Sequence, residues 1–217
     1  MAPNLCFATT YDVAADFSAT NNPNGVWSYG WSSTLTSVFN QYTDKYKPEG
    51  MGGIDVWGSG DRSYGPSVAY NGTGSAITID EHNITWQIGQ LSLGPGYNGQ
   101  YSHARWTAPY AGTFDIATVF TLLDGDGGST DVYVLHNGVS LFDGGLYGFG
   151  VPSSFSSFST TVSVGIDDTI DFAVGYGGDG FWNDSTALSA TIVPEPATLL
   201  LLGLGGLAVR RRRAGRN

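Results

Sequence analysis

The stretch GTFDIATVFTLL at residues 112–123 decides the fold class, because apolar and polar side chains alternate through it with the period of two of a half-buried β-strand. Five more strand-like stretches follow: TDVYVLH (130–136), VSLFDG (139–144), FSTTVSVG (158–165), TIDFAVG (169–175) and TALSATIV (186–193). They are separated by turn-forming residues at the short, regular spacing of an all-β sandwich. The sequence therefore predicts an antiparallel β-sandwich.

Asn137-Gly138 separates two of these stretches. This dipeptide readily adopts the positive φ angles of a two-residue hairpin turn, so the flanking strands are expected to pair antiparallel. Upstream, residues 76–88 read as two short strands around a turn at His82-Asn83. We expect residues 16–75, rich in Gly, Asn, Ser, Tyr and Trp, to form long loops and short edge strands, with one short helix at 35–42.

The net charge of −10 combines two segments of opposite sign. Residues 1–193 carry four basic side chains against eighteen acidic ones, whereas residues 194–217 carry five arginines against one glutamate. An acidic body repels nucleic acid and anionic membrane surfaces, so we expect no nucleic-acid partner. With Cys6 as the single cysteine, no disulfide is expected within the chain.

The basic tail has a fixed order of features. Pro194-Glu195-Pro196 is followed by an apolar run at 197–209 and by an arginine cluster at 210–216, comprising Arg210, Arg211, Arg212, Arg213 and Arg216. Thirteen helical residues span about 20 Å, short for a bilayer core of about 30 Å. Arginines beyond the apolar run favour a cytoplasmic C-terminus, with the acidic body outside. The sequence thus predicts a short C-terminal transmembrane helix.

This tail resembles the PEP-CTERM sorting signal of bacteria that make extracellular polysaccharide. The resemblance implies that an exosortase cleaves near Pro194-Glu195-Pro196 and that the body passes to the cell surface or extracellular matrix. An uncut tail anchor is the alternative. The chain divides accordingly into a β-sandwich domain at 9–193 and a sorting tail at 194–217.

Proteins with this signal normally also carry an N-terminal signal peptide. Residues 1–10 have neither a basic start nor a long apolar run, but Leu5-Cys6-Phe7-Ala8 resembles the end of an apolar region with a small-x-small cleavage site. We therefore expect translation to begin upstream of Met1. An in-frame stop codon directly upstream of Met1 would exclude this.

The body, over residues 10–193, resembles the jelly-roll β-sandwiches related to carbohydrate-binding modules. The resemblance implies sugar binding, which requires exposed aromatic rings and nearby polar groups. The candidates are the tryptophans in loop-like surroundings, namely Trp27, Trp31, Trp57 and Trp182. The alternative is that these rings fill the core beneath long loops, as we expect for Trp86 and Trp106.

A structural calcium is the cofactor that the sequence suggests. In similar modules an aspartate that opens the last strand, here Asp184, can hold calcium together with an N-terminal acidic residue such as Asp16. The stretch DGDGGSTD at 124–131 begins like a calcium loop but lacks its glycine and its closing glutamate, so it is read as a turn between strands.

Catalytic motifs are not evident. His82, His103 and His136 are scattered, with no metal-ligand spacing and no Gly-x-Ser-x-Gly elbow. A glycosidase needs two facing carboxylates, which the sequence alone neither places nor excludes. The expectation is an exported, non-enzymatic protein at the cell surface or in the biofilm matrix that binds exopolysaccharide. A structural or adhesive matrix protein is the main alternative, and a polysaccharide hydrolase is the less favoured one.

Overall fold

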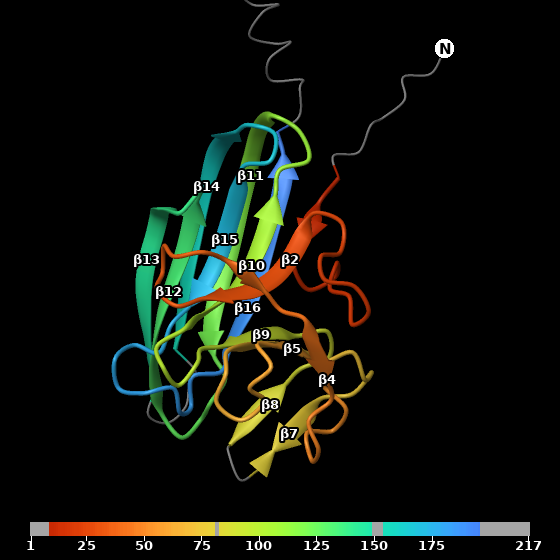
Figure 1. The fold of residues 1–217 in the computed structure, drawn as a ribbon, viewed down its shortest axis with the longest axis vertical. Coiled ribbons are helices and arrows are strands. Elements are labelled where there is room, and N and C mark those ends of the chain that lie inside the picture. The colour runs from red at the N-terminus through yellow and green to blue at the C-terminus, as the bar shows by residue number, and fades with distance from the viewer. Residues whose placement is uncertain (1–8, 81–82, 149–153, 196–217) are drawn as a thin grey trace, which may run out of the picture.

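The computed structural model describes residues 9–80, 83–148 and 154–195 as two antiparallel sheets that face each other, with a small hairpin at one end (Figure 1). The all-β prediction is confirmed. Within these residues no helix has the length and apolarity to cross a membrane. The predicted tail helix at 197–209 and the cleavage site at 5–8 lie outside the described residues.

The first sheet has the order β14-β11-β16-β9-β6-β5-β4, with β1 beside the far end of β16. Its strands are β1 (Tyr11–Asp12), β4 (Asp44–Tyr46), β5 (Asp55–Gly58), β6 (Ser67–Tyr70), β9 (Leu91–Gly94), β11 (Gly112–Leu122), β14 (Phe155–Val164) and β16 (Thr186–Pro194). In β11 buried and exposed side chains alternate, as the period of two predicted.

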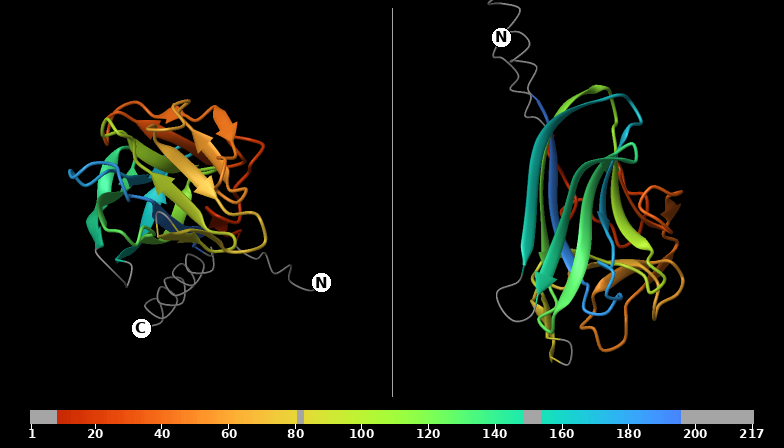
Figure 2. Two further views of the ribbon diagram at one scale, coloured as in Figure 1. Left: turned by 90° about the horizontal axis from the view of Figure 1, so that it is seen from below. Right: turned by 90° about the vertical axis from the view of Figure 1, so that its left-hand side faces the viewer.

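The second sheet has the order β13-β12-β15-β10-β2-β3. Its strands are β2 (Trp27–Ser32), β3 (Asn40–Gln41), β10 (Tyr101–Thr107), β12 (Gly128–His136), β13 (Val139–Gly148) and β15 (Thr169–Val174). The long strands run lengthwise through the sandwich, and loops collect at its ends (Figure 2). Their inward faces enclose one core, whose largest fully buried side chains include Trp27, Trp106, Tyr29, Phe114 and Phe172.

The predicted hairpin turn is confirmed. β12 ends at His136, β13 begins at Val139, and both intervening residues have positive φ, 50° at Asn137 and 77° at Gly138. The Asn137 side chain also donates to Asp168 Oδ1 and accepts from the Thr169 N–H. The turn therefore ties β12 to the start of β15 as well as to β13.

The hairpin of β7 (Ile77–Ile79) and β8 (Ile84–Trp86) forms a separate small sheet at one end of the sandwich. It covers a second apolar cluster that contains Ile54 and Val56. Strands at 76–88 were predicted, and Asn83 has the positive φ expected of a turn residue. The hairpin thus extends the domain with its own small core.

The short helix predicted at 35–42 is wrong. Residues 33–39 form a loop and Asn40–Gln41 pair with β2 as β3. The loop turns the Phe39 ring onto the backbone of Gly30, so close that a Cβ at Gly30 would lie 2.5 Å from it. Packing of Phe39 against the sheet, including His103 and Arg105 of the distant strand β10, thus overrides the weak local helical pattern.

Candidate functional site

Four aromatic rings gather at one end of the sandwich, supplied by three separate loops. Tyr64 lies between β5 and β6, Tyr97 between β9 and β10, and Phe181 and Trp182 between β15 and β16. The Tyr64 ring lies 6.0 Å from Tyr97, 5.9 Å from Phe181 and 6.4 Å from Trp182, and the adjacent Phe181 and Trp182 rings are 4.5 Å apart. We call these four residues the aromatic cluster.

Three of the four rings of the aromatic cluster are exposed to solvent. Trp182 is 66% exposed, Tyr97 61% and Tyr64 51%. The backbone beneath is fixed, because the Tyr97 N–H donates to the Tyr64 carbonyl and Asp61 Oδ1 accepts from the Tyr64 N–H. Large exposed aromatics gathered on an ordered backbone make this a candidate binding surface, since burying them inside would have stabilised the fold.

A cleft of about 470 Å³ lies beside the cluster. Its walls come from the β7–β8 hairpin, from β5, β6 and β9, and from the loop that carries Phe181 and Trp182. Apolar residues, among them Ile79, Ile84 and Trp86, line it together with polar groups that include Arg62, Asn183 and Asp184. An apolar cleft with a few polar groups is the usual form of a small-molecule site.

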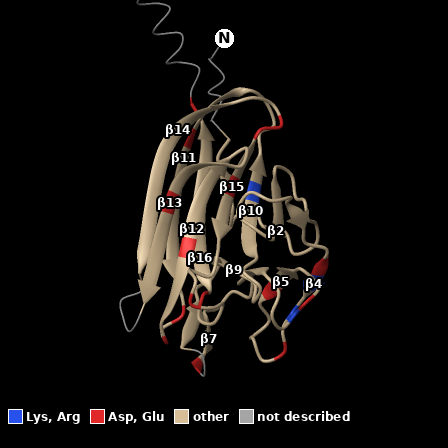
Figure 3. Cartoon of the chain, turned by 60° about the vertical axis from the view of Figure 1, so that its left-hand side comes forward, with Lys and Arg blue, Asp and Glu red and all other residues tan. Residues whose placement is uncertain are grey.

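Arg62 is a fixed cation at the rim of this cleft. Its guanidinium donates two hydrogen bonds of 2.7 Å to Asp44 and lies 4.6 Å above the centre of the Tyr46 ring. The hydrogen bonds from Arg62 hold the pKa of Asp44 below its ordinary value. Basic residues are few in the described body and cluster near β4, apart from Arg105 on β10 (Figure 3).

Asp184 is the most unusual polar group in the cleft. Its side chain is 2% exposed, and neither carboxylate oxygen has a hydrogen-bond partner. Burial raises the pKa of Asp184 to about 9, and the negative charges of Asp179, Asp124 and Asp131 add to the increase, while the nearby Ser129 N–H opposes it. A buried carboxyl without partners is costly, so a ligand or a bound cation would stabilise it.

The four tryptophans predicted to bind sugar lie in different environments. Trp182 belongs to the exposed aromatic cluster. Trp27 and Trp57 are buried, and their ring N–H groups donate to Asp16 and to the Ser18 carbonyl. Trp31 is partly buried against the main core. The predicted stacking role of Trp27 and Trp57 is therefore wrong. Their rings fill the interior, which was the alternative, and so do those of Trp86 and Trp106.

The predicted pairing of Asp16 with Asp184 at one ion is also corrected. Asp16 accepts from the Asp12 N–H, and Asp12 pairs with Thr191 near the end of β16. Asp184 precedes Thr186, the first residue of β16. Five residues of extended strand between Thr186 and Thr191 span about 17 Å, whereas calcium ligands lie about 2.3–2.6 Å from the ion.

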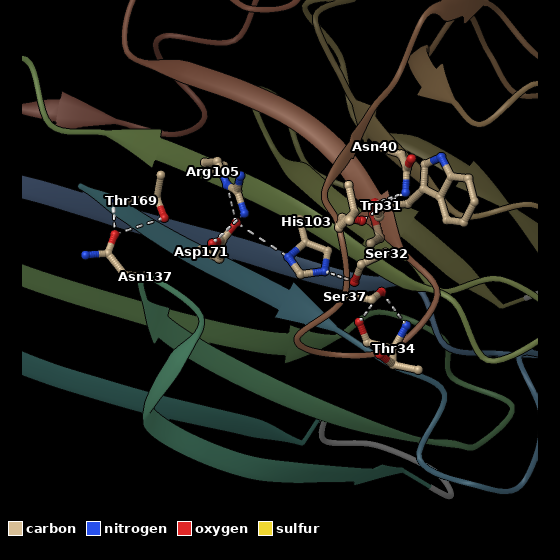
Figure 4. A network of polar contacts seen from close by, with 12 residues as sticks. Trp31, Ser32, Thr34, Ser37, Asn40, His103, Arg105, Asn137, Thr169 and Asp171 are labelled. Atoms are coloured by element: carbon tan, nitrogen blue, oxygen red, sulfur yellow. Dashed lines mark hydrogen bonds and ion pairs between the residues drawn. The ribbon is translucent and has the colours of Figure 1, made fainter. Parts of the chain in front are cut away.

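A buried polar network that no sequence motif indicated lies on the outer face of the second sheet (Figure 4). Ser32 Oγ lies 2.7 Å from His103 Nε2, and His103 Nδ1 lies 3.6 Å from Asp171 Oδ1, beyond hydrogen-bond distance. Arg105 donates two hydrogen bonds to Asp171. The Phe39 ring covers the network, 4.0 Å from the Arg105 guanidinium.

This order of Ser, His and Asp resembles that of a hydrolytic triad, but the environment is that of a structural network. Ser32 is 1% exposed beneath the loop at 33–39, so its hydroxyl has no access to a substrate. Asp171 accepts its hydrogen bonds from Arg105, whereas His103 Nδ1 makes none, unlike the His of a triad. We therefore assign the network to stability.

The end of β16 leads directly into the tail predicted from sequence. A family model described as the PEP-CTERM protein-sorting motif matches residues 193–213. The chain carries a PEP-CTERM sorting motif. The match contains every residue predicted for sorting: Pro194, Glu195, Pro196, Arg210, Arg211, Arg212 and Arg213.

Solved structures similar to the chain have sandwich folds but low scores. A CBM51 module from Clostridium perfringens GH95, solved with methyl-galactose, is 13% identical, with a TM-score of 0.36 over 71% of this chain and 94% of the module. A CBM35 module from Paenibacillus barcinonensis is 13% identical, with a TM-score of 0.34 over 86% and 99%. No curated protein matches the chain. At these scores the structural likeness carries no argument about function.

Proposed function

We propose that this PEP-CTERM protein is exported, held in the inner membrane by its tail, and processed by an exosortase for transfer to the cell surface or the exopolysaccharide matrix. The sorting motif at 193–213 supports this step. There the body acts without catalysis and binds carbohydrate through the aromatic cluster. The observation that carries the binding proposal is the exposed Trp182 beside the cleft.

The chemistry of the cluster fits a polysaccharide. The apolar faces of sugar rings stack on flat aromatic side chains, while hydroxyl groups need hydrogen-bond partners. Trp182, Tyr97 and Tyr64 offer such rings, and Arg62 and Asn183 line the adjacent cleft. The described body has a large excess of acidic over basic residues, which disfavours a nucleic acid as the ligand.

Hydrolysis is the weaker alternative on the same cleft. Asp124 and Asp184 both line it, and a glycosidase requires two carboxyl groups that reach the scissile bond. Each oxygen of Asp184 exposes less than 1 Å². A general acid buried this deeply does not reach a sugar, so we favour binding. Release of reducing sugar from a bound polysaccharide would contradict this assignment.

Replacing Trp182 with alanine should weaken glycan binding at least tenfold, which is about 1.4 kcal/mol, because the substitution removes the most exposed ring of the cluster. The full chain in detergent would be screened on a glycan array, and the affinity for the strongest glycan then measured by calorimetry. Tyr147→Ala is the matched control, since Tyr147 is an exposed ring on β13.

Two results would count against carbohydrate binding. If Trp182→Ala and Tyr147→Ala bind equally well, the aromatic cluster is not the site. If no glycan binds the wild-type chain, a structural or adhesive role in the matrix becomes the better account of the body.

We also propose a structural calcium at Asp184, without Asp16. Its two unpartnered oxygens provide the supporting observation, and Asp124 lines the same cleft. Among the described residues no three acidic, His or Cys side chains converge on a metal position, so backbone carbonyls or water would complete the ligand set.

Chelation should therefore lower the melting temperature of the wild-type protein. Calcium at 100 times its Kd would stabilise the native state by about 2.7 kcal/mol. Asp184→Asn should abolish the difference between EDTA and calcium, whereas Asp16→Asn should retain it. Identical melting curves for the wild type in EDTA and in calcium would exclude the site.

A further inference from the structure

The sorting motif begins inside the folded sheet. The match starts at residue 193, whereas β16 ends at Pro194. Val193 pairs with Asp115 of β11, and Pro194 pairs with Phe114. Beyond the strand, the Glu195 N–H donates a hydrogen bond of 2.9 Å to the Thr113 carbonyl. The first two residues of Pro194-Glu195-Pro196 are thus held against β11.

No linker separates this pairing from the apolar run. Pro196 alone stands between Glu195 and the run that begins at residue 197, and one extended residue spans about 3.5 Å at most. An enzyme that recognises Pro194-Glu195 must therefore act next to the folded body.

The end of β16 cannot be released without losing contacts. Ile192, two residues before Pro194, is fully buried, as is Phe114 opposite Pro194. The last rung is weaker, because the Glu195–Thr113 hydrogen bond lies beyond the end of β16. Strand ends open locally at lower free energy than the core.

A protease or transpeptidase binds the segment that it cleaves in its own active site. The backbone groups of that segment must first leave any sheet that engages them, so cleavage depends on the fraction of molecules in the open state.

We infer that the pairing of Val193, Pro194 and Glu195 with β11 is a latch on the sorting motif, and that the processing enzyme takes up Pro194-Glu195 only after this end of β16 opens. The inference rests on the proposed processing by an exosortase. It adds that the folded body itself sets the rate of sorting.

Two variants change the latch in opposite directions. A four-residue Gly-Ser insertion between Val193 and Pro194 separates the motif from β11 while β16 stays paired through Val193. Asp115→Cys with Val193→Cys closes the latch covalently, because directly paired antiparallel residues have Cα atoms about 4.5–5.5 Å apart, within the range of a disulfide. The two single-cysteine variants are the controls.

The rate of processing would be followed by pulse-chase and mass spectrometry in a host with its own exosortase. The insertion should accelerate processing about fivefold, because the free energy of opening then no longer includes the loss of about one hydrogen bond. The disulfide should slow processing, and reduction should restore the rate of the single-cysteine variants.

Glu195→Ala distinguishes a failure of the proposed exosortase processing from a failure of the latch. It should block processing in the wild-type and insertion backgrounds if an exosortase reads the motif. If the wild type is never cut, both the proposed function and the latch are wrong. If Glu195→Ala blocks cutting but the insertion and disulfide variants are processed at the wild-type rate, sorting stands and the latch is wrong.

Discussion

Replacing Asp171 with asparagine is expected to lower the free energy of unfolding by about 3–5 kcal/mol, a large part of the 5–15 kcal/mol typical of a domain. The Asp171 side chain is 1% exposed and accepts two hydrogen bonds from Arg105, with His103 beside it. An amide keeps the shape but leaves the Arg105 guanidinium without its counter-ion. Urea unfolding of the purified protein measures the loss.

The same substitution should change how the free energy of unfolding depends on pH in the acidic range. Burial works to raise the pKa of Asp171, but His103 and Arg105 outweigh it and hold the pKa below its ordinary value. The stabilisation is therefore complete above the unfolded-state pKa and is lost as the pH falls below it. Asp171→Asn should flatten this dependence.

Two further variants test whether the loss of stability in Asp171→Asn comes from its ion pair with Arg105. Asp143→Asn alters an exposed carboxylate on β13 and should change stability by less than about 0.5 kcal/mol. Asp171→Leu with Arg105→Met should cost less than Asp171→Asn alone, because the partly buried Arg105 charge is not left without its partner. Equal losses for Asp171→Asn and Asp143→Asn would show that the ion pair contributes little.

The elements of the fold that could be predicted are those that short stretches of sequence specify by themselves. β11 carries its alternation within eleven residues, and Asn137-Gly138 specifies its turn through its own φ preferences. The first third was less predictable. Trp27 and Trp57 stand among turn-forming residues and read as surface rings, yet both are buried by segments distant in sequence.

The site was only partly predictable for the same reason. Trp182 was a candidate, but its neighbours Tyr64 and Tyr97 come from loops between other strands and meet it only after the sheets form. The Ser32–His103 contact likewise depends on how β2 pairs with β10. The sorting motif was predictable because its features follow one another along the chain.

Asn71 is the residue whose side chain fastens the β7–β8 hairpin to the sandwich. It is fully buried at the end of β6. Its Nδ2 donates to the carbonyls of Ser75, Trp86 and Gln87, and its Oδ1 accepts from the N–H and the hydroxyl of Thr73. One side chain thus satisfies five backbone and hydroxyl groups on both sides of the hairpin.

Changing Asn71 to aspartate, which keeps the shape, should destabilise the protein by at least about 3 kcal/mol. The new carboxylate oxygen replaces a donor that faces three carbonyl oxygens, so three acceptors lose their partner and a buried charge meets repulsion. Burial beside three carbonyl oxygens should hold the pKa of the new carboxyl above its unfolded value of about 4. The loss should therefore shrink as the pH falls towards about 4, because the protonated carboxyl donates one hydrogen bond again.

The damage should begin at the hairpin. Hydrogen exchange of Asn71→Asp should rise first in β7 and β8, because these strands depend on Asn71 and on the small second core. Ile79, Ile84 and Trp86 form one wall of the cleft, so glycan affinity should fall together with hairpin protection. Asn98→Asp, at an exposed loop position beside Tyr97, adds the same charge without these contacts and should leave exchange in β7 and β8 unchanged. If both variants keep wild-type stability and exchange, the five hydrogen bonds of Asn71 do not hold the hairpin in place.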